Sequence, residues 1–308
     1  MNQARIQTEK ILDKLYNPLK NKLKNKPKTY RKLARKNYLL VAKQRRPKKK
    51  VRNQAIKKQL QYIRRNLSHI EELSIQEASL LCLSKKEYKN LLVVAEVYRQ
   101  QLWMYENKTI RIDDRIVSIN QPHIRPIVRG KTGSSVEFGA KISVSCVDNY
   151  VFLDRLSWDN FNESQDFIQQ VESFNKQTGY YPESVHVDKI YRTRKNRAFC
   201  KEKGIRISGV PLGRPPKNTS IPAKKQAQED ERIRNCIEGK FGQGKRRFSL
   251  KRIMTKLEST SRTSIAITFL VINLSRLLKE ALIAFLCQFF KTILFSRSMI
   301  MNRYALTS

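Results

Sequence analysis

The chain has 308 residues, and its 63 Lys and Arg against 26 Asp and Glu give a formal net charge of +37. A charge of this size excludes an ordinary cytosolic enzyme and indicates a polyanionic partner, with nucleic acid favoured over an anionic membrane surface. The length suits one large or two ordinary domains, and 40% hydrophobic residues suffice for a core, which excludes a merely disordered basic tail.

The five cysteines and three histidines bear on compartment and metal content. No two cysteines stand in a CxxC pair, so neither a structural zinc site nor a disulfide framework is expected, and a reducing, cytoplasmic and nucleoid-associated location is predicted. The N-terminal MNQARIQTEK lacks the apolar core of a signal peptide. The apolar stretch 281–295 is shorter than the roughly 20 residues of a membrane span, so a packing helix is expected there.

The segment 14–70 is strongly basic. It holds 21 Lys and Arg and no acid, and Pro27 and Pro47 should interrupt any helix within it. A solvated, partly disordered arm is one interpretation, and contact with DNA is the favoured one. The residues predicted to contact DNA here are Arg45, Arg46, Lys48, Lys49 and Lys50.

Two helical patterns follow, and they predict a helical hairpin. Each has apolar residues at spacings of three and four, which place them on one face of a helix. In the first helix these are Ile56, Leu60, Ile63, Leu67 and Ile70, and in the second, within 87–108, they are Leu91, Val94, Tyr98, Leu102 and Tyr105.

Beyond residue 109 the spacing of the hydrophobic residues changes, and the expected elements form an α/β layer that begins with antiparallel strands. Alternation over 136–147 predicts a half-buried strand, with 150–158 as its hairpin partner. A helix is expected at 162–179, capped by Asn162 and ended by Gly179. The expected order then continues as strand 183–188, helix 193–204, strand 205–209, a Gly/Pro loop 210–222 and helical structure over 226–295.

Two carboxylates in basic surroundings are the candidate chemical groups. Asp188 follows a short strand, and Glu238 lies in NCIEGKFGQGKRRF on a later helix. Carboxylate oxygens suit Mg²⁺, and two such ions serve phosphodiester transfer. A helix cap or an ion-pair partner is the alternative interpretation for each acid.

Several segments together resemble the DDE transposases of bacterial insertion sequences. They are SVHVDKIYRTRKNRAFCKEKGIRISGVPLGRPPK, RNCIEGKFGQGKRRFSLKRIMTKLESTSRTSIAITFLVINL, and the earlier DRIVSINQPHIRPIVRGK, VEFGAKISVS and FLDRLSWDNFNES. The resemblance implies an RNase H-like mixed sheet flanked by helices, with Asp188 and Glu238 as catalytic ligands of Mg²⁺ or Mn²⁺. It also implies DNA as substrate and a homodimer or higher synaptic oligomer, with no membrane partner.

The same resemblance brings a signature of Tyr, Arg, Glu and Lys at fixed spacing. Arg234, Glu238 and Lys245 fit it, whereas Glu231 stands at the Tyr position. The basic residues of the signature are assigned to DNA phosphates. The full set expected to bind DNA in this half of the chain is Arg192, Arg194, Arg234, Lys245, Arg246 and Arg247.

The first Asp of the family pattern has no counterpart on a strand before residue 100. Asp13 lies in a helical setting, and Asp113 and Asp114 are the internal substitutes, where a strand could precede them. The expectation is therefore an N-terminally truncated transposase that lacks its first core strand and is impaired. Its expected domains are a basic arm with helical hairpin at 1–108, a catalytic core at 109–280 and an apolar C-terminal helix at 281–308.

Two other functions stay open. One is a non-catalytic DNA-binding remnant that inhibits an intact transposase, and the other is an RNA-binding or ribosomal protein, which the pI of about 10.3 alone suggests. His186 is expected to be a satisfied core histidine rather than a partner of Asp188, and Trp103 and Trp158 to be core anchors.

Overall fold

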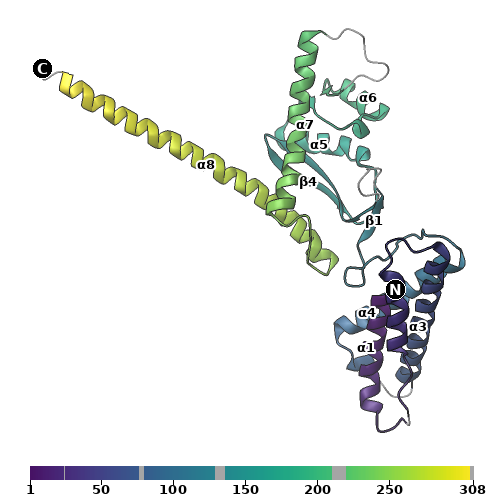
Figure 1. Ribbon diagram of the computed structural model, residues 1–308. Helices are drawn as coiled ribbons and strands as arrows, with labels where there is room; N and C mark the ends of the chain where they lie inside the picture. Colours follow the sequence, from purple (N-terminus) through teal and green to yellow (C-terminus); the bar gives the residue numbers. More distant parts are fainter. Residues whose placement is uncertain (24, 76–79, 129–135, 210–219, 306–308) are drawn as a thin grey trace. The chain divides into compact units, whose positions relative to one another are not determined.

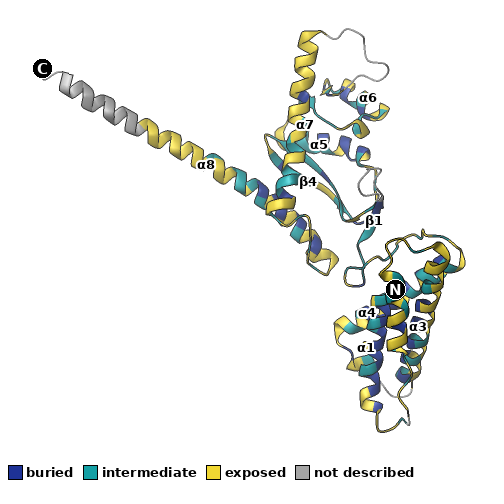
Figure 2. Cartoon of the chain, viewed as in Figure 1, coloured by how far each residue is buried: buried dark blue, intermediate teal, exposed yellow. Residues whose placement is uncertain are grey.

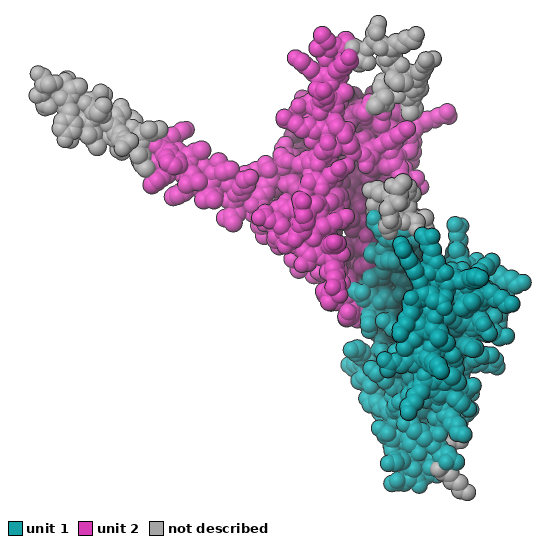
Figure 3. All heavy atoms as spheres, in the orientation of Figure 1, with its two compact units in different colours: residues 1–139 teal, residues 140–308 magenta. Residues whose placement is uncertain are grey.

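The computed structural model describes residues 1–23, 25–75, 80–128, 136–209 and 220–305, with side chains through residue 291 (Figure 1). The chain divides into two compact units, unit 1 at Met1–Gly139 and unit 2 at Ala140–Ser308 (Figure 3). The expected Gly/Pro loop lies mostly outside the described residues, because only 220–222 of it are described.

Unit 1 is a helical bundle with a small β-hairpin. The expected helical hairpin is confirmed, and a further helix near the N-terminus packs against both of its members. The elements are α1 (Asn2–Leu19), α2 (Arg31–Ala42), α3 (Lys49–Ile75), η1 (Leu80–Cys82), α4 (Lys85–Glu106) and the antiparallel strands β1 (Arg125–Val128) and β2 (Val136–Gly139).

The apolar stripe of α3 is buried as its spacing predicts. Leu60, Ile63 and Ile70 are at most 4% exposed. Ile70 packs in one core cluster with Leu12 of α1, and Ile63 packs in another with Ala4 of α1. On α4 the prediction is only partly right. Leu91 and Val94 are buried, whereas Tyr98, Leu102 and Tyr105 are half-buried. The other buried positions of α4 are Asn90, Val97, Gln100 and Met104.

The basic segment 14–70 is helical rather than a disordered arm. Pro27 and Pro47 lie in the two connections between α1, α2 and α3, as expected of helix breakers. The helices form because each has an apolar residue that packs inward, such as Ala34 of α2, which is fully buried. The basic residues of the second connection remain exposed.

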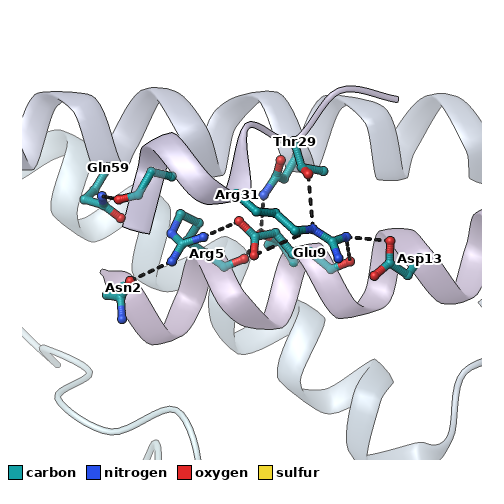
Figure 4. Close-up of polar contacts among 10 residues, drawn as sticks. Asn2, Arg5, Glu9, Asp13, Thr29, Arg31 and Gln59 are labelled. Atoms are coloured by element: carbon teal, nitrogen blue, oxygen red, sulfur yellow. Dashed lines mark hydrogen bonds and ion pairs between the residues drawn. The ribbon is translucent and has the colours of Figure 1, made fainter. Parts of the chain in front are cut away.

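The centre of the bundle also holds charged groups. Arg5 and Glu9 of α1 are 2% and 6% exposed, and they form an ion pair (Figure 4). Arg5 also donates to Asn2, and Arg31 of α2 donates to the carbonyl of Glu9 at 3.1 Å. These contacts replace the water that each buried charge gives up on folding.

Unit 2 begins with the expected hairpin. β3 (Lys141–Val147) pairs antiparallel with β4 (Tyr150–Ser157), and the turn residues Asp148 and Asn149 adopt positive φ. The strand expected at 136–147 is interrupted, because Gly139 has φ +151° and the chain divides there between β2 and β3. Ser143, expected on a polar face, is 1% exposed and accepts from Gln170, so a helix covers that face too.

The alternation of helix and strand after the hairpin agrees with the sequence. A second pair of strands is parallel. The helical segment between the two pairs is capped by Asn162 at its start and by Gly179 at its end, as predicted. The elements are η2 (Glu163–Gln165), α5 (Phe167–Thr178), β5 (Ser184–Val185), η3 (Lys189–Tyr191), α6 (Arg194–Glu202), β6 (Arg206–Ile207), α7 (Ile221–Arg247) and α8 (Glu258–Ala305).

The described strands do not join into one sheet. β1–β2, β3–β4 and β5–β6 are three separate two-stranded sheets. The mixed α/β class is confirmed, and an antiparallel hairpin precedes a parallel pair as expected. The strands in the described ranges do not form the single mixed sheet that was expected.

The C-terminal region is helical but not continuous, because residues 248–257 separate α7 from α8. Gly244 of α7 permits the turn, since a Cβ there would lie 3.1 Å from Leu250 and 3.3 Å from Ile272. The side-chain amide of Asn273 in α8 donates to the carbonyl of Val151 in β4 and accepts from its N–H. These two bonds satisfy the backbone groups of Val151.

Burial falls along α8, from buried positions against the hairpin to exposed apolar ones further on (Figure 2). Among the described residues, no helix is both long and apolar enough to cross a membrane. Trp158 is 7% exposed and is a core residue as expected, whereas Trp103 is 44% exposed because it lies off the buried face of α4.

Candidate active site

Asp188 stands three residues beyond β5 and directly before η3. Its backbone is extended, with φ −66° and ψ 158°, and its side chain is 62% exposed. It makes no capping bond to the short helix that follows. The helix-cap interpretation of Asp188 is therefore not what the structure shows.

Glu238 lies in the middle of α7, and Arg234 one turn before it brings the two acids together. Arg234 Nη1 donates to Asp188 Oδ1 and also lies 3.5 Å from Glu238 Oε1. Asp188 and Arg234 are 46 positions apart in the sequence. The two acids that the resemblance singled out thus converge on one guanidinium nitrogen, and Glu238 remains 69% exposed.

A third acid, Glu231, reaches the same guanidinium. Its Oε1 accepts from Arg234 Nη2 at 2.5 Å, and its Oε2 accepts from Nε at 3.1 Å. These bonds lower the pKa of Glu231, and Glu231 first, with Asp188 after it, raises the pKa of Arg234. In the sequence Glu231 is a departure from the signature, but its spacing of three from Arg234 already indicates contact on a helix.

A separate network fastens α7 to the parallel strands. Arg206 of β6 donates two hydrogen bonds to Asp230 of α7, at 2.8 and 2.9 Å, and His186 Nδ1 lies 3.4 Å from the same carboxyl. Arg206 chiefly lowers the pKa of Asp230, while burial lowers that of His186. The Nε2 of His186 is 3.1 Å from Ser184 Oγ, but its buried Nδ1 makes no hydrogen bond within the described residues, so the expected satisfied core histidine is only partly confirmed.

The hairpin touches α7 through two cysteines. Cys146 Sγ of β3 lies 3.8 Å from Cys236 Sγ, and Cys236 in turn donates to Asn149 Oδ1 at 2.7 Å. Burial, followed by the neighbouring Cys236, raises the pKa of Cys146 to about 12. No motif in the sequence indicates this pair, because the two residues are 90 positions apart.

The donor atoms at Asp188 and Glu238 suit a hard divalent cation, but the set is small. Within the described ranges, no three Asp, Glu, His or Cys side chains lie close enough to hold a metal ion. The expected substitutes, Asp113 and Asp114, do not follow a strand. They form a turn of unit 1, where Asp114 has φ +51° and lies 3.6 Å from Arg125.

Asp13 is excluded as a free ligand by its partners. It lies on α1, as its helical setting indicated, and accepts from Arg31 at 2.5 Å and Lys26 at 2.7 Å. Burial acts to raise the pKa of Asp13, but the ion pairs outweigh it and the pKa is lowered.

The predicted DNA-binding residues differ in exposure. Arg192 is half-buried, with its guanidinium 3.1 Å from the Cβ that Gly209 would carry, so it is a poor candidate for DNA. Arg194 is exposed at the start of α6. Those exposed in the last turn of α7 are Lys245, Arg246 and Arg247, and those exposed around the start of α3 are Arg45, Arg46, Lys48, Lys49 and Lys50.

Comparison with known families agrees with this geometry. Residues 185–275 match the family described as transposase DDE domain, and the match contains Asp188, Arg234 and Glu238. This part of the chain is therefore a DDE transposase domain. No curated protein and no solved structure gives a significant match.

Proposed function

We propose that the protein is a transposase whose chemistry is metal-dependent cleavage and transfer of DNA strands, with Asp188 and Glu238 as metal ligands. The observation that supports this is their convergence on Arg234 from two distant parts of the chain. A purely structural ion pair is usually well buried or contributes little, and these acids are mostly exposed. Mg²⁺ or Mn²⁺ would activate the attacking oxygen and stabilise the leaving one.

Arg234 has a second part in this proposal. In the structure it forms ion pairs with Asp188, Glu231 and Glu238. A DNA phosphate offers the guanidinium an alternative bidentate partner. When Arg234 turns to that phosphate, Asp188 and Glu238 become available to a cation, so DNA and metal should bind cooperatively.

The chain as described is proposed to be impaired. Two carboxylates are one fewer than the family pattern requires, and β3–β4 and β5–β6 remain separate sheets. In an RNase H-like arrangement a further strand, carrying the first Asp, would pair between them. Full strand-transfer activity from these 308 residues alone would contradict this part of the proposal.

The first experiment measures metal binding and strand cleavage together. Titration calorimetry with Mn²⁺ should show binding that Asp188→Asn and Glu238→Gln each abolish and that Arg234→Gln strengthens. Nicking of supercoiled plasmid in Mn²⁺ should be weak and lost in both carboxylate variants. Mn²⁺ binding that both variants retain would refute the ligand assignment, and Asp159→Asn on an exposed loop of unit 2 is the control.

A non-catalytic DNA-binding protein that inhibits an intact transposase is the second candidate. The exposed residues Arg45, Arg46 and Lys48–Lys50 favour it, because they require no metal to contact phosphates. No nicking by the wild type, together with tight DNA binding and inhibition of an intact copy in the same assay, would select it.

DNA binding itself is tested with matched lysine pairs. Lys49 and Lys50 begin α3, and Lys85 and Lys86 begin α4; all four are exposed. Replacing the first pair by Ala should reduce the slope of log K against log salt by about 2, since each phosphate contact contributes about 0.9. Equal effects of the two pairs would contradict a specific contact at the start of α3. Self-association and a nucleoid location stay predictions, the former testable by light scattering.

A further inference from the structure

We propose that Cys146 and Cys236 form a reversible disulfide that ties α7 to the β3–β4 hairpin beside the candidate active site. The two sulfur atoms lie 3.8 Å apart, on elements that are distant in the sequence. A disulfide needs the sulfurs at about 2.05 Å, so the two side chains must turn toward each other for the bond to close. Nothing in the DDE chemistry uses either residue.

The surroundings of the pair permit oxidation. Both side chains are of intermediate exposure, whereas Cys200 is 1% exposed within the core of unit 2. Cys236 donates to Asn149 in the hairpin turn, which holds its sulfur next to that of Cys146. Cys82 and Cys287 are exposed and so provide internal references for ordinary surface thiols.

The reaction requires a two-electron oxidant, and oxidised glutathione or hydrogen peroxide serves. Burial raises the pKa of Cys146, so Cys236 is the thiol that peroxide oxidises: it becomes a sulfenic acid as the O–O bond breaks and water leaves. The second thiol then displaces the hydroxyl, so that the S–S bond forms and a second water is released. Two thiols are oxidised, one peroxide is reduced, and a dithiol reductant reverses the process.

The bond would act on the active site through α7. Cys236 precedes Glu238 by two residues and follows Arg234 by two, so the cross-link holds this part of the helix against the hairpin. The closed loop spans 90 positions and contains Asp188. Oxidation should therefore restrict how far Arg234 and Glu238 can move relative to β3.

The test uses the full chain, treated with oxidised glutathione and digested with trypsin without reduction. Cleavage after Lys141, Arg155, Arg234 and Lys240 should give the peptides 142–155 and 235–240 joined by a disulfide. The cross-link should disappear on reduction, and it should form at lower oxidant than glutathionylation of Cys82 or Cys287. The oxidised protein should unfold several degrees higher than the reduced one.

Variants separate this proposal from simple packing of two small apolar side chains. Cys236→Ser should abolish the cross-link and the oxidant-dependent rise in Tm, while Cys82→Ser should leave both intact. Cross-links that join Cys82 or Cys287 between molecules, with Cys146 and Cys236 still alkylatable, would overturn it. The peptide analysis is made on the wild type, so it decides even if a variant does not fold.

Discussion

Two arginine–glutamate pairs in this molecule share the same spacing on a helix but differ in burial and in the residues around them. Arg5–Glu9 in unit 1 and Arg234–Glu238 in unit 2 are both separated by four residues on a helix. The side chains of the first pair are 3% and 8% exposed, and those of the second are 24% and 69% exposed. Their surroundings therefore decide the role of each pair.

The buried pair is surrounded by groups that serve the bundle. Asn2 accepts from Arg5, and Arg31 of α2 donates to the backbone carbonyl of Glu9 (Figure 4). The exposed pair instead gathers acids, because Arg234 also contacts Asp188 and Glu231. An exposed arginine that holds three carboxylates is positioned for exchange with solvent, cations or phosphate, and a buried one is not.

The largest expected effect comes from breaking the buried pair. Arg5→Met removes the main partner of the buried Glu9 carboxylate, which keeps only Arg31 Nε at 3.9 Å, and should lower the free energy of unfolding of unit 1 by about 3 kcal/mol. Arg234→Met, the matched variant, should cost less than about 1 kcal/mol, because exposed pairs contribute little. Denaturant unfolding followed by Trp103 in unit 1 and Trp158 in unit 2 measures both. Equal losses would show that burial does not separate the two pairs.

An intermediate loss of stability is expected from breaking the Arg206–Asp230 ion pair, which holds α7 against β6. Asp230 is 7% exposed as a residue, and Arg206 supplies two of its hydrogen bonds. Arg206→Met should destabilise unit 2 by about 2 kcal/mol, the usual range for hydrogen bonds to a charged group. It should also weaken Mn²⁺ binding, since α7 carries Glu238. A variant that loses stability but binds Mn²⁺ as the wild type does would show that this ion pair does not position the site.

The sequence predicted those features that depend on local patterns. The stripe of α3, the caps at Asn162 and Gly179, and the order of elements in unit 2 follow from periodicity and turn residues, which act over a few positions. Asp188 and Glu238 were found by resemblance, and the structure brings them together. Whether they bind metal stays a prediction.

The rest depends on contacts between distant segments. Burial of Ser143 requires α5 to cover the hairpin, and the approach of Cys146 to Cys236 requires α7 to pack on β3. A partly disordered arm is one interpretation of the basic segment from its sequence, because the single buried position of α2, Ala34, makes no apolar pattern among the charged residues. No spacing rule in the sequence reports such packing.

The smallest effect is expected at Glu87, whose exposure lies between the two extremes. Its side chain is 36% exposed, accepts from Lys14 at 2.6 Å and closes a capping box with Ser84 at the start of α4. Lys14 first, and Ser84 after it, lowers the pKa of Glu87 from 4.5 to about 2. A carboxyl with a lowered pKa stabilises the fold fully above its unfolded value and loses that contribution as the pH falls through the folded value.

Glu87→Gln keeps an acceptor in the capping box and removes the charge. Wild type should exceed it in stability by less than about 1 kcal/mol at pH 6, and the difference should shrink between pH 4.5 and about 2. Thermal unfolding across this range measures it, with Lys14→Met as the matched removal of the partner. A difference that stays constant with pH would place the contribution in the cap geometry, and charge would then matter only where it is buried.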